Sequence, residues 1–222
     1  MNKILTAALI LISQTILAQN ISITEQNVLF LNGQQPALVS TIYNNSLNEV
    51  MDKWKSYMKS FKNEKVKSDK GEIFADNIMI KEWGNNTVDI YARLEENKGD
   101  KSVKIMVAFD LGGAYLTSAS DAGKYAYAEK MIRDFAVETS KAPLVANLKD
   151  AEKALSKMEG DRDGFEKNIK SLKGDIESYK DKIKKAEEDI QKNETELGKK
   201  KSEIDAQRTA IQLLNSKIGE VR

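Results

Sequence analysis

A heptad repeat in the last third of the sequence limits what this chain can fold into more than any other feature. From Leu144 onward, alternating steps of four and three residues reach apolar side chains, with few exceptions, over about eleven heptads. Three or four such heptads already indicate a coiled coil. Segment 144–222 is therefore predicted to be a long helix that pairs with another helix through an apolar seam. The seam residues are Leu148, Leu155, Ile169, Leu172, Ile176, Tyr179, Ile183, Ile190, Leu197, Ile204, Ile211, Leu214 and Ile218.

The two columns of this seam differ in composition. With Leu148 assigned to heptad position a, that column is almost entirely Ile and Leu, and Arg162 is its one polar member. The d column is mixed and becomes polar at Asn193, Lys200 and Gln207. Because β-branched residues at a favour a two-stranded parallel coil, we expect a homodimer whose seam is looser around the polar d positions.

The charges that flank the seam are a second indication of whether the two helices pair in parallel. In a parallel homodimer each g residue faces the e residue five positions later on the partner helix. The attractive pairs are Asp175 with Lys180, Lys182 with Glu187, Glu196 with Lys201 and Glu203 with Arg208, and the repulsive pairs are Asp161 with Glu166 and Asp189 with Glu194. Exposed pairs contribute only a few tenths of a kcal/mol each, so the charges favour a parallel homodimer weakly.

A helical hairpin is the competing arrangement. Gly160 and Gly164 lie close together, and each weakens a helix by about 1 kcal/mol relative to Ala. The heptad register nevertheless continues through them without a skip, which a turn would not require. The sequence therefore favours a continuous helix with a weak point at these glycines.

The first half of the chain alternates between apolar and polar residues, as expected for an antiparallel sheet with one buried face. Strands are predicted at 28–31, 37–43, 72–83, 87–94 and 103–110. In segment 72–83, the buried face is assigned to Phe74, Ile78 and Ile80.

Two helices are expected to cover the buried face of this sheet. Ser46 is a suitable cap for the first, whose apolar stripe includes Val50, Trp54 and Met58. The second is predicted over 121–140, and Pro143 either kinks or ends it. The predicted fold class is therefore α+β, an antiparallel sheet with helices on one face, followed by a long C-terminal α-helical coiled coil.

The order of these elements resembles a family of exported bacterial domains of unknown function with a TBP-like fold. The matching residues are Leu47, Val50 and Trp54 in the first helix and segment 68–73, which opens the next strand. The resemblance covers residues 37–116. It implies a fold and an exported location, but no chemistry.

The N-terminus reads as a secretory signal peptide. Lys3 supplies a positive charge, residues 4–12 are apolar, and a small residue, Ala18, ends the segment. The expected product is periplasmic or secreted, without a lipid anchor because no Cys follows the apolar run; the alternative is an uncleaved apolar helix. No later stretch has the length of a transmembrane helix. The predicted organisation is a signal peptide at 1–18, an α+β head at 19–143 and a coiled-coil stalk at 144–222.

Composition excludes several kinds of chemistry. The chain has no Cys and no His, which removes the usual nucleophile pairs, disulfides and Cys or His metal sites. Its 35 basic and 34 acidic residues give no clustered basic excess for nucleic acid. Ser56 and Lys59 match S-x-x-K, but the helical pattern directs Ser56 toward solvent. We expect no enzyme activity, no cofactor and no metal.

The outer face of the predicted sheet is the candidate working surface. Alternation places apolar and aromatic residues among polar ones there, which is typical of partner binding. These residues are Ile73, Met79, Tyr91, Arg93 and Met106, with Trp83 at the rim. In the alternative interpretation, the second helix, the N-terminal strands or a dimer mate covers this face.

Two functions fit the sequence. The first is a non-enzymatic envelope protein in which a coiled coil dimerises a small head and serves as a scaffold, spacer or protein-interaction module. The second is a head that binds or processes a small ligand, with the helical segment serving only for dimerisation or folding back as a hairpin.

Overall fold

The computed structural model describes residues 20–61 and 65–220 of the chain, so the predicted signal segment 1–18 lies outside the described residues. The chain divides into two compact units, Met1–Ala151 and Glu152–Arg222, which we call the sheet unit and the helical unit. The α+β class is confirmed.

The sheet unit contains a six-stranded antiparallel sheet with strand order β1-β2-β6-β5-β4-β3. Its strands are β1 (Thr24–Phe30), β2 (Gly33–Tyr43), β3 (Val66–Asp69), β4 (Glu72–Met79), β5 (Thr87–Asn97) and β6 (Ser102–Asp110). A short 3-10 helix, η1 (Lys81–Trp83), follows β4. The five predicted strands are present, and β3 is an additional edge strand that pairs with β4.

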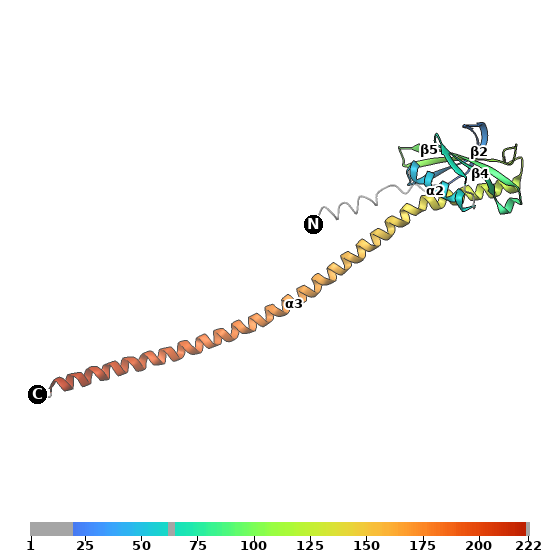
Figure 1. The fold of residues 1–222 in the computed structure, drawn as a ribbon. Helices are drawn as coiled ribbons and strands as arrows, with labels where there is room; N and C mark the ends of the chain where they lie inside the picture. The colour runs from blue at the N-terminus through green and yellow to red at the C-terminus, as the bar shows by residue number, and fades with distance from the viewer. Residues whose placement is uncertain (1–19, 62–64, 221–222) are drawn as a thin grey trace. The chain divides into compact units, whose positions relative to one another are not determined.

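One face of the sheet is covered by α2 (Leu47–Ser60) and by the first part of α3 (Ala122–Glu220), which lie together along it (Figure 1). Helix α2 begins where the sequence predicted, because the Ser46 hydroxyl accepts a hydrogen bond from the Glu49 amide while the Glu49 carboxylate accepts one from the Ser46 amide. Trp54 of α2 is fully buried. Its ring packs edge-on against that of Phe135 of α3, with the ring centroids 4.8 Å apart. The main core therefore lies between these two helices and the sheet.

The opposite face of the sheet carries a second, smaller core. Its buried residues come from β1, β2 and β6, and they are Phe30, Ala37, Val39, Met106 and Ala108. The turn between β1 and β2 is fixed to β4 and β5: the Leu31 amide donates to the Glu72 carboxylate at 2.9 Å, and Arg93 donates to the Leu29 carbonyl at 2.6 Å. The N-terminal strands therefore cover much of the face that the sequence left open.

A β-bulge in β4 reverses the predicted alternation of that strand. The pairing register with β5 shifts between Ala75 and Ile78, and Asn77 adopts a left-handed backbone conformation with φ 56°. Ile73 consequently lies in the main core and Phe74 stacks on Tyr91 on the opposite face, whereas the alternation had assigned them the other way round. The assignment of Ile78 and Ile80 to the core is confirmed.

Helix α3 is continuous from Ala122 to Glu220 and contains Pro143 within it. Pro143 therefore does not end the helix. Gly160 and Gly164 are also helical, so the hairpin interpretation is wrong for this segment and the continuous interpretation is confirmed.

Candidate functional site

Most of the exposed large apolar residues in the described part of the chain lie on the helical segment, along its predicted seam. Every one of its residues is exposed, from 46% at Ile204 to 71% at Ile218. Burying one such Ile or Leu side chain fully would contribute about 1.5–3 kcal/mol. A long, regular apolar stripe of this kind marks an interaction surface, because a helix that is stable alone in water does not expose one.

Several charged residues on the rest of the helical surface are paired within the helix. Ion pairs link residues three positions apart, as between Glu177 and Lys180 at 2.8 Å and between Glu196 and Lys199 at 2.9 Å. These groups are largely exposed, so each pair contributes little. The polar faces can remain in water, whereas the apolar stripe is uncovered in the structure.

The helix segment just before this stripe is attached to the sheet unit by a hydrogen-bond network around Pro143. Proline has no amide hydrogen, so the Thr139 carbonyl loses its ordinary donor four residues later. The Asn45 side-chain amide donates a hydrogen bond to that carbonyl at 2.9 Å. The Lys53 ammonium group donates one to the Asn45 side-chain oxygen, also at 2.9 Å. A side chain from the β2–α2 connection thus replaces the missing helical hydrogen bond.

A second contact lies one residue further along α3. The Ser140 hydroxyl accepts a hydrogen bond from the Tyr43 amide at the end of β2, at 2.9 Å. Thr139 and Ser140 are the last buried residues of α3, and the exposed stripe begins with Leu144. This network could not be predicted from the sequence, because Asn45 and Pro143 are far apart in the chain.

The structure separates the six residues predicted to form a partner-binding face. Ile73 and Met106 are buried in the two cores, and Trp83 packs on the helix-covered side against Phe109 and Tyr127. The placement of Ile73 on the outer face was therefore wrong, because of the bulge at Asn77. Trp83 was expected at the rim of that face, but it lies in η1, beyond the regular strand, and packs on the other side.

The other three predicted residues remain on the surface or near it. Tyr91 stacks on Phe74 with ring centroids 4.7 Å apart, and Arg93 is engaged with the Leu29 carbonyl and with Glu95. Only Met79 is a strongly exposed apolar residue of this group, at 50%. A broad apolar binding face is therefore not formed by these residues.

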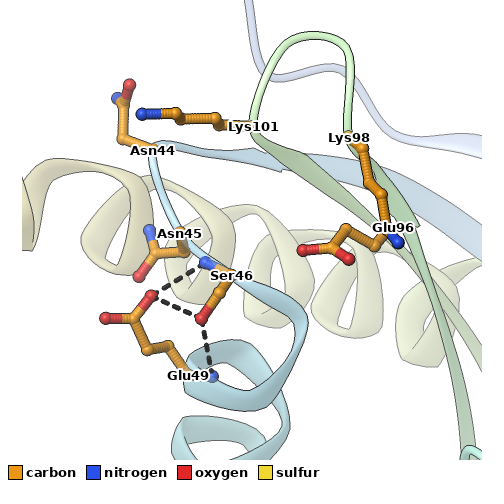
Figure 2. A pocket seen from close by; sticks show the side chains of 7 residues that line it. All are labelled: Asn44, Asn45, Ser46, Glu49, Glu96, Lys98 and Lys101. Atoms are coloured by element: carbon orange, nitrogen blue, oxygen red, sulfur yellow. Dashed lines mark hydrogen bonds between the residues drawn. The ribbon is translucent and has the colours of Figure 1, made fainter.

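Two pockets of the sheet unit were considered as ligand sites. The first, of about 430 Å³, lies between the start of α2 and the β5–β6 hairpin (Figure 2) and is lined by Asn44, Asn45, Ser46, Glu49, Glu96, Lys98 and Lys101. Its best-placed polar groups already serve the fold: the hydrogen bond from the Ser46 amide lowers the pKa of Glu49, and Asn45 binds the Thr139 carbonyl. Glu49 and Asn45 therefore serve the local structure.

The second pocket, of about 540 Å³, lies beside Met79. It combines apolar and polar side chains, namely Ser60, Phe61, Asn77, Met79, Lys81, Glu82, Thr87 and Tyr127. Burial raises the pKa of Tyr127, and its hydrogen bond to Glu82 adds to the effect. The neighbouring Trp83 has a buried indole Nε1 with no hydrogen-bond partner among the described residues.

Other candidate chemistry finds little support. The Ser56 hydroxyl is on the exposed side of α2 and donates to the Asp52 carbonyl at 2.9 Å. Within residues 20–61 and 65–220, no group of three acidic, His or Cys side chains could hold a metal ion. Nor does any helix of this described part combine the length and hydrophobicity needed to cross a membrane.

No protein-family model, no curated protein and no solved structure matches this chain. The resemblance to exported domains with a TBP-like fold stays a prediction.

Proposed function

We propose that the chain is a non-enzymatic, exported assembly protein in which the helical segment pairs with a second copy and joins two sheet units into one particle. The observation that carries this proposal is the exposed apolar stripe on an uninterrupted helix. A second copy of the chain offers a stripe of the same length and spacing, so the two can bury each other along their whole extent.

The proposed role as a scaffold or spacer follows from the dimensions of the helical unit. At 1.5 Å per residue, its helix from residue 152 to Glu220 extends roughly 100 Å. An unpaired helix with this exposed composition is marginal in water, since most helical stability in proteins comes from packing. Pairing would therefore provide both the stability of the helix and the reason for its length.

Export is supported by the sequence alone, through the apolar segment that precedes Gln19. A protein without disulfides in an oxidising compartment relies on packing for its stability. The two apolar cores of the sheet unit and a paired coil would supply it.

The proposal is tested by placing charge in the seam. We expect Ile176→Glu combined with Ile183→Glu to abolish dimerisation and to lower the melting temperature of the helical circular dichroism signal, because two carboxylates per chain would be buried without partners. The matched control, Ser171→Glu with Ser178→Glu, adds the same charge outside the seam. It should leave dimerisation and melting nearly unchanged. Equal behaviour of the two double variants would contradict the proposal.

A second candidate function, binding of a small ligand by the sheet unit, is favoured by the pocket beside Met79 and the unpartnered Trp83 Nε1. The two functions can be told apart in the full chain. Ligand binding at this pocket should persist in the Ile176→Glu and Ile183→Glu variant, whereas a function that depends on assembly should be lost.

A further inference from the structure

We infer that the two copies align parallel and in register, and that the polar d residues Asn193, Lys200 and Gln207 select this alignment. The inference rests on the proposed pairing of two copies and adds its geometry. It depends on which side chains each possible alignment brings into contact across the seam.

In a parallel, in-register pair, each a or d residue meets the same residue of the partner. Asn193 then faces Asn193 and Gln207 faces Gln207, so each amide can donate to and accept from its counterpart. The a column contributes layers of Ile against Ile from residue 169 to 190, the arrangement that favours two parallel strands. Polar groups meet polar groups and apolar groups meet apolar groups.

An antiparallel pair brings a residues against d residues instead. With the two segments fully overlapped, Asn193 would face Ile176 and Lys200 would face Ile169, while Arg162 would face Gln207. Sliding the helices by one heptad in either direction still sets Asn193 against an isoleucine, Ile169 or Ile183. A buried amide without a partner costs about 1–3 kcal/mol, which exceeds the few tenths of a kcal/mol available from each exposed charge pair.

The two cations in the seam are the main objection to a parallel alignment, because each would face its own copy. Both are already paired with a carboxylate on their own helix. Lys200 Nζ lies 2.5 Å from a Glu203 oxygen, and an Arg162 guanidinium nitrogen lies 2.7 Å from an Asp163 oxygen. Long basic side chains can keep the charged group at the edge of an apolar seam, so these pairs reduce the repulsion.

The charges beside the seam agree with this alignment. Four of the facing pairs in a parallel, in-register dimer attract and three repel, the third repulsive pair being Lys217 with Arg222. Parallel pairing also places both sheet units at the same end of the paired segment. A target that offers two copies of one binding surface would then be held by both units at once, with the gain in apparent affinity that bivalence provides.

Cysteine cross-linking tests the alignment cleanly because the natural chain has no Cys. In the full chain, Ile211→Cys lies at an a position and Thr209→Cys at the outward f position of the same turn. A disulfide needs Cβ atoms about 4 Å apart, so under a glutathione redox buffer Ile211→Cys should convert almost completely to covalent dimer and Thr209→Cys should not. In a mixture of the Ile211→Cys and Met158→Cys variants, full antiparallel overlap would instead link an Ile211→Cys chain to a Met158→Cys chain. That cross-link between unlike chains would overturn the inference.

The polar residues are tested by replacing them together. The variant Asn193→Leu, Lys200→Leu and Gln207→Leu should melt at a higher temperature than the natural chain but lose its single alignment, giving mixed cross-links or larger oligomers in the Ile211→Cys background. Unchanged, purely parallel cross-linking in this variant would show that the polar residues do not select the alignment. A chain that is monomeric in every variant would instead remove the proposed pairing itself, so the two failures are distinguishable.

Discussion

At the scale of single residues, Asn45 explains how a helix can continue through a proline. Pro143 leaves the Thr139 carbonyl without a helical donor, and the Asn45 amide occupies the vacant position at 2.9 Å. Asn45 is buried, and its other hydrogen bonds go to the Tyr43 carbonyl and Lys53. The side chain therefore links β2, α2 and α3 at the place where α3 leaves the sheet.

This link can be measured by a double-mutant cycle. We expect Asn45→Ala to lower the free energy of unfolding of the sheet unit by about 1–3 kcal/mol, because it leaves a buried carbonyl without a donor. In a Pro143→Ala background the new amide can donate to Thr139, so the cost of Asn45→Ala should fall by about 0.5 kcal/mol or more. Chemical denaturation followed by tryptophan fluorescence reports both values. An identical cost of Asn45→Ala in the two backgrounds would show that its hydrogen bond to the Thr139 carbonyl does not contribute to stability.

At the scale of elements, the bulge in β4 decides which side chains face the core. Asn77 adopts φ 56°, a conformation that Asn and Gly tolerate and β-branched residues do not. Its backbone amide donates a hydrogen bond to the Asp89 carboxylate at 2.8 Å, which anchors the bulge to β5. The bulge is thus encoded by Asn77 together with a residue on the neighbouring strand.

Substitutions at Asn77 should separate backbone strain from side-chain contacts. We expect Asn77→Gly to change the free energy of unfolding by no more than about 0.5 kcal/mol, and Asn77→Val to lower it by about 1–2 kcal/mol because Val is strained in the left-handed region. Urea denaturation of the two variants provides the comparison. If Asn77→Val proves as stable as Asn77→Gly, the bulge does not depend on this conformation.

The elements also show what the sequence could and could not predict. Alternation and helical periodicity located the main strands and α2, because these patterns follow directly from one buried face. The bulge broke the alternation, and so Ile73 and Phe74 were assigned to the wrong faces. The continuity of α3 through Pro143 depends on Asn45, a tertiary contact that no local pattern contains.

Of the candidate interaction surfaces, the exposed seam could be predicted from the sequence, and the face of the sheet could not. The seam of the helical segment follows from a repeat along one helix, and the structure leaves all of it exposed. The proposed face of the sheet required knowledge of what packs on it. Because the β1–β2 turn crosses that face through Glu72 and Arg93, residues such as Met106 are buried instead of available.

At the scale of the whole molecule, the proposed assembly is the central property. The sheet unit buries its apolar residues in two cores of its own. The helical segment does not, and it exposes an apolar residue at nearly every seam position. Under the proposed pairing this stripe is buried only in the paired form, so function should follow from that form.

Sedimentation equilibrium of the chain beginning at Gln19 tests this claim most directly. We expect a mass twice that of a single chain at micromolar concentration, with dissociation on dilution or in the Ile176→Glu and Ile183→Glu variant. A mass equal to that of one chain across the accessible concentration range, with the helical signal intact, would contradict it.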